Sequence, residues 1–223
     1  MRTAFRAELD RLTSDLADMC AVARATMQCA SASLIQLDDN SAVRVGAHLK
    51  RLDLLHADAE KRVMSLLALQ APVAHDLRIV VSAIPIAASA DRMGGLANNV
   101  DKLARRYRPL PAAPPEGLDH LDAMAVVALK LADEVEAAVP TGDADAARRI
   151  AGDGDDSMDR LHRGLFALVM DPRWQHGPTA AADLILLGRF YGRYADHISD
   201  IASRVVFCAT GEHLSMETVS ETS

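Results

Sequence analysis

Aromatic residues are scarce in this chain, and so are cysteines. Only 4% of the 223 residues are Phe, Trp or Tyr, whereas half are hydrophobic, chiefly Ala, Leu and Val. Small aliphatic side chains suit closely packed helices better than half-exposed sheets. Cys20, Cys29 and Cys208 include no C-x-x-C pair, so neither a disulfide framework nor a zinc knuckle is indicated. The composition predicts a helical protein in a reducing, cytoplasmic setting.

Long apolar runs and a secretory signal are lacking too. Arg2, Arg6, Glu8 and Asp10 interrupt the start of the chain, and no uninterrupted apolar run approaches the roughly 18 residues of a membrane span. We therefore expect contact with a membrane only through a partner.

Sequence signatures of common catalytic sites are also missing. The chain has no G-x-x-x-x-G-K-[ST] loop, no G-x-S-x-G elbow and no H-E-x-x-H helix. It also has no Glu-x-x-His, the motif of ferritin-like oxidases. The sequence predicts a protein that is not an enzyme.

The balance of charge argues against nucleic acid as a partner. The formal net charge is -7 and the basic residues are dispersed, so no positive footprint for a phosphate backbone is evident. Arg105, Arg106 and Arg108 form the only tight basic cluster. We interpret it as a cationic helix end that opposes the helix dipole, rather than as an anion site.

Apolar residues recur at intervals of three and four along six stretches, which predicts six long helices. Pro72 separates the second stretch from the third, Pro85 is expected to kink the third, and Gly211 is expected to cap the last. The predicted helices are Leu9 to Leu37, Val45 to Leu66, Leu77 to Arg106, Leu118 to Val139, Ala144 to Met170 and Leu184 to Cys208. Long helices joined by short turns are typical of all-α bundles.

A proline-rich segment at 108–116 divides the chain near its middle, and it is predicted to be a stiff linker. We assign a first three-helix bundle to 1–107 and a second to 117–212. The polar tail, 213–223, is predicted to be disordered.

The two halves are similar to each other at an offset of about 101 to 106 residues. Residues 52–56, LDLLH, align with 158–162, MDRLH, and residues 91–100 align with 192–201. Such an offset suits two copies of one domain. The predicted fold is therefore two tandem, pseudo-symmetric three-helix bundles.

Polar residues spaced by four lie on the third helix of each half, where they share one helix face. Carboxylates and imidazoles also follow one another on the middle helices, as Asp53 with His56 and Asp159 with His162. Converging carboxylates could bind a cation, but an acidic chain also carries solvated acidic faces, and His56 on an apolar stripe fits a core histidine better than a ligand. The candidate metal ligands are Asp53, Asp91, Asp155, Asp159, Asp196 and Asp200.

Four motifs, in order along the chain, are carried by a known family: HDLR at 75–78, DRMG at 91–94, RYADH at 193–197 and VVFCATGE at 205–212. With them the chain resembles the PhoU family, the accessory proteins of phosphate-specific transport. The resemblance extends from Phe5 to about Glu212. It implies two pseudo-symmetric three-helix bundles, in agreement with the internal repeat.

The resemblance also implies a function. PhoU-like proteins are negative regulators that couple a phosphate ABC transporter to a sensor histidine kinase. We therefore expect a cytoplasmic regulator that lowers phosphate uptake and phosphate-starvation signalling. Its expected partners are the ATPase subunit of the transporter, the sensor kinase of the phosphate two-component system and a second copy of itself.

The family's signature is an acidic residue followed four places later by Asp, twice per bundle, and it can bind iron or other metals. In the second bundle Asp155 and Asp159 keep one pair, while Gly192 replaces the first acid before Asp196.

The first bundle keeps fewer of these acids. Leu49 stands before Asp53, and Gly95 follows Asp91. A site for iron, zinc or another divalent metal is therefore expected in the second bundle rather than in the first. The alternative functions are a carboxylate-metal protein with an enzymatic or storage role, and a purely structural helical adaptor.

Overall fold

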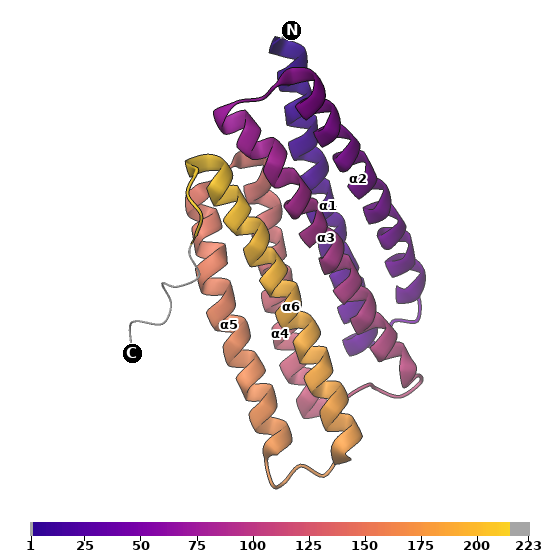
Figure 1. Ribbon diagram of the computed structural model, residues 1–223. Helices are drawn as coiled ribbons and strands as arrows, with labels where there is room; N and C mark the ends of the chain where they lie inside the picture. Colours follow the sequence, from indigo (N-terminus) through magenta and orange to yellow (C-terminus); the bar gives the residue numbers. More distant parts are fainter. Residues whose placement is uncertain (1, 215–223) are drawn as a thin grey trace, which may run out of the picture.

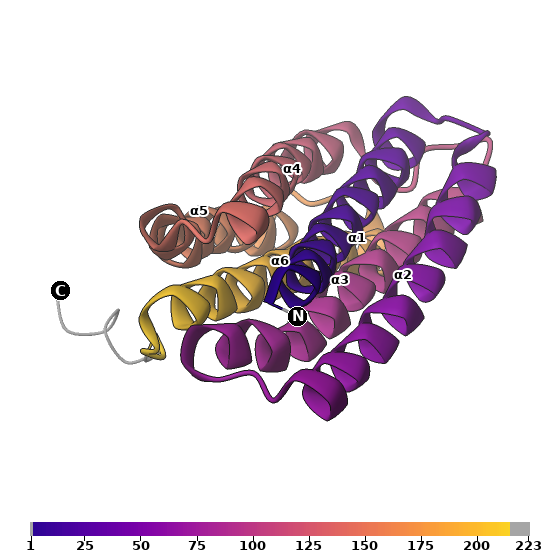
Figure 2. The ribbon, with the colours of Figure 1, turned by 90° about the horizontal axis from the view of Figure 1, so that it is seen from above.

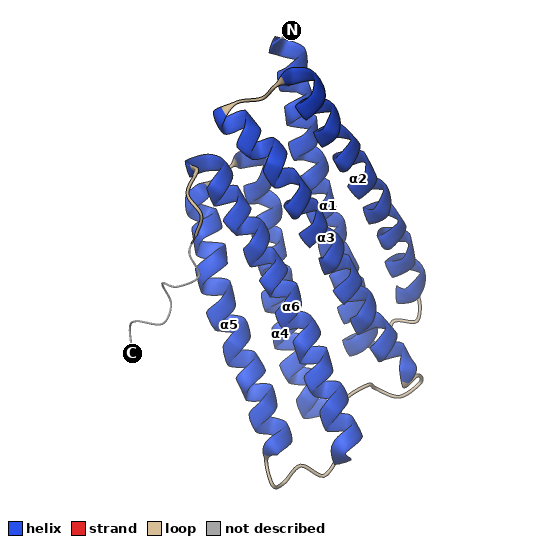
Figure 3. Cartoon of the chain, in the orientation of Figure 1, coloured by secondary structure: helices blue, strands red, loops and turns tan. Residues whose placement is uncertain are grey.

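The computed structural model describes residues 2–214, and the side chains of 4–152 and 156–214 within them. Within that part of the chain all regular structure is helical (Figure 3). The six helices are α1 (Arg2–Gln36), α2 (Ser41–Gln70), α3 (Ala74–Arg106), α4 (Pro115–Thr141), α5 (Ala144–Met170) and α6 (Gly177–Thr210). The predicted all-α fold is confirmed, whereas most of the tail predicted to be disordered, 213–223, lies outside the described range, which ends at residue 214.

The helices form two three-helix bundles that lie side by side (Figure 1). Seen from above, α2, α3, α6 and α5 follow one another along one side, with α1 and α4 behind them (Figure 2). Across the boundary α1 packs on α4 and α3 packs on α6, so equivalent helices of the two halves meet. We call the side formed by α2, α3, α6 and α5 the front face.

One continuous hydrophobic core runs through both bundles. Its largest fully buried side chains include Leu12 and Met19 of α1 and Tyr191 and Tyr194 of α6. Burial of one large apolar side chain, such as that of Leu12, stabilises the folded protein by roughly 1.5–3 kcal/mol. Because this core crosses the boundary, the division into folding units at 108–116 stays a prediction.

Helix ends follow the local sequence. Gly211 caps α6 with φ 82°, and its N–H donates to Phe207 O at 2.9 Å, as expected. The side chain of Asp143 accepts hydrogen bonds from the backbone N–H groups of Asp145 and Ala146 at the start of α5. The predicted linker is too long by two residues, because α4 begins at Pro115, where a proline loses no helical hydrogen bond.

Helix α3 occupies the centre of the molecule and contacts α1, α2 and α6. It continues through Pro85. By length and composition it is apolar enough to cross a membrane, and 44% of its most apolar stretch of 18 residues is buried inside the protein. The sequence prediction concerned uninterrupted apolar runs, and in α3 charged residues such as Asp76, Arg78 and Asp91 interrupt the apolar positions. Its position makes it a core helix, with Leu77, Val81 and Ile84 left exposed.

Candidate functional site

Carboxylates of the second bundle gather on α5 and α6. Asp196 and Asp200 are one helical turn apart on α6, and their side chains are 52% and 66% exposed. Asp159 comes from the neighbouring α5 and is also exposed. Partial burial raises the pKa of the Asp196 carboxyl, and the charges of Asp200 and Asp159 add to this effect, while Arg193 and His197 oppose it. Two helices thus bring acids into electrostatic reach of one another.

The two histidines nearest these acids are held differently. Nδ1 of His197 lies 3.6 Å from an oxygen of Asp200, beyond hydrogen-bond distance, and burial lowers the pKa of this imidazole. His162 packs edge-on against Phe166, with ring centroids 5.2 Å apart. Its Nε2 is buried and has no hydrogen-bond partner among the described residues. The structure therefore does not bring His162 Nε2 into a hydrogen bond with Asp159, Asp196 or Asp200.

The acids of the first bundle are more dispersed. Asp53 is exposed on α2, and Asp91 is half-buried on α3. His56 is 26% exposed, and its Nε2 lies 3.6 Å from Glu60 on the same helix. The interpretation of His56 as a core histidine is therefore wrong, because the ring lies at the edge of α2 beside a carboxylate.

No group of three or more His, Cys, Asp or Glu side chains converges as a metal site within the described part of the chain. Of the predicted ligands, the side chain of Asp155 lies outside that part. The remaining five are Asp53, Asp91, Asp159, Asp196 and Asp200. A site in the second bundle that includes Asp155 stays a prediction.

The glycines that replace family acids lie in open space. A Cβ atom on Gly95 or Gly192 would meet no atom within 4 Å, whereas one on Gly188 would lie 3.1 Å from Leu165 Cδ2. Of these three glycines, only Gly188 therefore lies where two helices approach closely. An acidic side chain at Gly95 or Gly192 would meet no steric obstacle at its Cβ.

The basic cluster at the end of α3 is used within the fold. Arg105 Nε donates to Asp101 at 2.8 Å, Arg106 lies 3.6 Å from Asp183, and Arg108 donates to Ser33 O at 2.8 Å. These contacts agree with our interpretation of the cluster as a structural helix end, because two of the guanidinium groups donate hydrogen bonds within the fold and the third pairs with a carboxylate.

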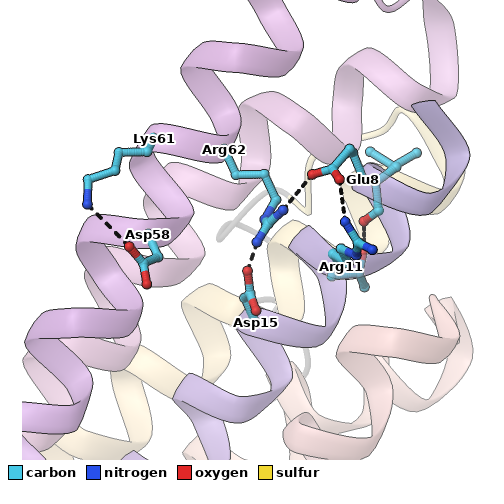
Figure 4. A network of polar contacts seen from close by, with 8 residues as sticks. Glu8, Arg11, Asp15, Asp58, Lys61 and Arg62 are labelled. Carbon is cyan, nitrogen blue, oxygen red and sulfur yellow. Dashed lines mark hydrogen bonds and ion pairs between the residues drawn. The ribbon is translucent and has the colours of Figure 1, made fainter. Parts of the chain in front are cut away.

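A polar network that the sequence did not reveal ties α1 to α2 (Figure 4). Arg62 of α2 donates to Glu8 at 2.5 Å and to Asp15 at 3.0 Å, and Arg11 also donates to Glu8. The hydrogen bond from Arg62 holds the pKa of Glu8 below its usual range. The partners are 47 and 54 residues apart, so no local spacing could have indicated them. The network is structural, and it lies on α1 and α2 rather than on α5 and α6.

The arrangement in two bundles agrees with comparisons to known proteins. The PhoU domain matches twice, over residues 16–104 in the first bundle and 121–205 in the second. The chain belongs to the PhoU family. Each bundle contains one match to the PhoU domain, so the resemblance inferred from the motifs is confirmed.

Curated PhoU relatives are similar over nearly the whole chain. The phosphate-specific transport system accessory protein PhoU homolog 2 of Mycobacterium tuberculosis is 44% identical over 211 residues, which cover 95% of this chain and 99% of that protein. PhoU homolog 1 of Mycobacterium leprae is 43% identical over 219 residues, 98% of each chain. Identity of 43–44% over nearly the whole chain supports a PhoU-like role in phosphate transport.

Solved PhoU structures share the fold. The phosphate transport system regulatory protein PhoU of Streptococcus pneumoniae superposes with a TM-score of 0.82 at 22% identity, covering 95% of this chain and all of that one. PhoU of Pseudomonas aeruginosa gives a TM-score of 0.80 at 24% identity, covering 93% and 100%. These two likenesses confirm the fold of two pseudo-symmetric bundles.

Proposed function

We propose that this PhoU-family chain is a cytoplasmic negative regulator that lowers phosphate uptake and phosphate-starvation signalling when phosphate is plentiful. It acts without catalysis, by docking helix faces onto the ATPase subunit of a phosphate ABC transporter and onto the sensor histidine kinase of the phosphate two-component system. It reaches the membrane only through these partners.

The observation that carries this proposal is the double PhoU match, one per bundle, together with relatives named as accessory proteins of phosphate-specific transport. The surface of the chain also carries exposed apolar and acidic residues that suit contact with a partner protein. Exposed Leu77, Val81 and Ile84 follow α3 on the front face, and Asp196 and Asp200 lie on the adjoining α6. Apolar contacts bordered by charge are typical of reversible protein interfaces.

Deletion of the gene tests the regulatory role. In phosphate-rich medium we expect a deletion strain to take up more phosphate and to express starvation genes, and the wild-type gene should restore both. Any paralogue is deleted as well, so that compensation does not mask the effect. Unchanged uptake and expression in the strain lacking all copies would contradict the proposal.

Binding tests the partner assignments separately. The purified chain should bind the purified ATPase subunit and the cytoplasmic part of the kinase in calorimetric titrations. We also propose that the chain forms the homodimer expected from the family resemblance. Light scattering of the chain alone tests this, since a dimer has twice the 23.9 kDa mass of the chain. A chain that binds neither protein would exclude direct docking, whatever the deletion strain shows.

We also propose, as a second candidate, a divalent-metal site in the second bundle, with iron or zinc as the cation. The observation that favours it is that Asp159 of α5 lies within electrostatic reach of Asp196 on α6, so that carboxylates of two helices could share one cation. Elemental analysis of purified protein tests it, with Asp159→Asn/Asp196→Asn as the depleted variant. Equal metal content in the variant and the wild type would exclude these ligands. If metal is present, assays for oxidase and storage activity distinguish an enzymatic from a regulatory role.

A further inference from the structure

A cleft of about 660 Å³ opens at the end of the molecule where the two bundles meet. The beginnings of α1 and α3 and the ends of α4 and α6 line it, and all four lie at the upper end of Figure 1 and face the viewer in Figure 2. Its volume is in the range of ligand-binding clefts, roughly 300–1,000 Å³. This cleft lies apart from Asp159 and Asp196.

The floor of the cleft is apolar and comes from all four helices. Leu9 of α1, Ile79 of α3, Val139 of α4 and Val205 of α6 line it. The lining extends along α1 from Arg6 to Ala17, which is roughly 16 Å at 1.5 Å per residue. About three turns of a helix would fit along that length. Such a groove suits the apolar side of an amphipathic helix.

The rim of the cleft is rich in hydrogen-bond acceptors. The carboxylates of Asp10 and Asp76 line it, and neither makes an ion pair or side-chain hydrogen bond among the described residues. The hydroxyl of Thr13 donates to Leu9 O at 3.0 Å, and that of Thr141 donates to Ala137 O at 3.0 Å. Both hydroxyl hydrogens are therefore engaged, which leaves oxygen lone pairs for a ligand.

The histidine on the rim adds another acceptor. His75 Nδ1 lies 3.0 Å from the backbone oxygen of Cys208. Because a carbonyl only accepts, Nδ1 carries the hydrogen, and Nε2 of the neutral ring is an acceptor. Arg6 is the one Lys or Arg side chain in the lining; it lies one helical turn before Asp10 on α1, whereas Asp76 lies on α3. A donor-rich, cationic group matches this rim.

We propose that the cleft binds an amphipathic helix of a partner protein, with apolar side chains on the floor and Lys or Arg side chains at Asp10 and Asp76. The charge complementarity of the rim selects a basic helix over an acidic one. This inference names a surface beyond the front face and does not depend on phosphate regulation.

Fluorescence anisotropy with three labelled helical peptides tests it. The peptides share one apolar face and carry Lys, Gln or Glu beside it. We expect the Lys peptide to bind about tenfold more tightly than the Glu peptide. Asp10→Asn/Asp76→Asn should weaken binding of the Lys peptide about fivefold to tenfold. The control Asp18→Asn/Asp119→Asn removes the same charge from exposed positions of α1 and α4 and should leave binding unchanged.

A second variant blocks the floor. Ala17→Trp places a large ring in the lining of the cleft and should abolish peptide binding, with circular dichroism confirming that the helices remain. Equal affinity for the three peptides, equal effects of the two Asn double variants, or no binding would overturn the proposal. Binding of dodecyltrimethylammonium without the Lys peptide would instead assign the cleft to a small cationic amphiphile. Loss of the site in a dimer would assign it to self-association.

Discussion

The hydroxyl of Ser31 on α1 lies 2.8 Å from the phenolic oxygen of Tyr191 on α6, in the buried seam between the two bundles. Burial raises the pKa of Tyr191, so the phenol is neutral and can donate or accept in this bond. The bond joins residues 160 positions apart. It is a buried polar contact between the bundles, in contrast to the more exposed ion pair of Arg24 with Asp133.

Removing either partner of that bond should destabilise the protein. We expect Tyr191→Phe and Ser31→Ala each to lower the free energy of unfolding by about 1 kcal/mol, because each leaves a buried hydroxyl or cavity behind. The double variant should cost less than the sum of the two single variants. Urea unfolding of the four proteins measures the coupling. Strict additivity would show that the contact contributes nothing.

Two adjacent glycines on α3 should respond in opposite directions to the same substitution. A Cβ on Gly94 would overlap with Leu52 Cδ1 and lie 3.4 Å from Leu49 Cδ2, whereas Gly95 has nothing within 4 Å. We expect Gly94→Ala to destabilise the protein by about 1–3 kcal/mol through overpacking. Gly95→Ala should stabilise it by up to about 1 kcal/mol through helix propensity. Thermal unfolding of both variants measures this, and a loss at Gly95 would contradict the open surroundings.

The Asp196 carboxyl should reduce stability as it ionises. Its pKa in the folded protein is raised above the ordinary value by burial, so the folded state favours the protonated form, and stability falls as pH rises through that raised pKa. Asp196→Asn should therefore stabilise the protein at about pH 7, by about 0.5 kcal/mol after solvent screening, and have little effect at about pH 3. Urea unfolding at both pH values measures the difference. The control Asp18→Asn removes the same charge from an exposed position of α1 and should change the free energy of unfolding by less than about 0.5 kcal/mol.

Restoring a missing acid should strengthen the proposed metal site. Gly192 stands four residues before Asp196, and its Cβ position is open. We expect Gly192→Asp to raise the affinity for Fe²⁺ or Zn²⁺ about tenfold, because an added carboxylate contributes another anionic ligand. Calorimetric titration measures the affinity. Gly46→Asp adds the same charge at another open position on α2 and should leave it unchanged. Equal affinity in both variants would contradict a site at Asp196.

The helices could be predicted from the sequence because their periodicity is local and long. The presence of two related bundles could be predicted because the second half of the chain repeats the residue pattern of the first. Contacts such as Arg62 with Glu8 could not, since they depend on the register between α1 and α2 rather than on spacing. The open surroundings of Gly95 and Gly192 were also beyond reach, because a helical glycine fits both close packing and empty space. The acceptor-rich cleft gathers the ends of four separate helices, so no single motif marks it.

The packing of α1 on α4 and of α3 on α6 gives this chain the geometry of a dimer of single bundles. In a true dimer every substitution would be made twice, whereas tandem copies can diverge one at a time. They have done so here: one half has Asp91 with Gly95, and the other has Gly192 with Asp196. Selection can therefore adjust the surface of one bundle for one ligand or partner without altering the other.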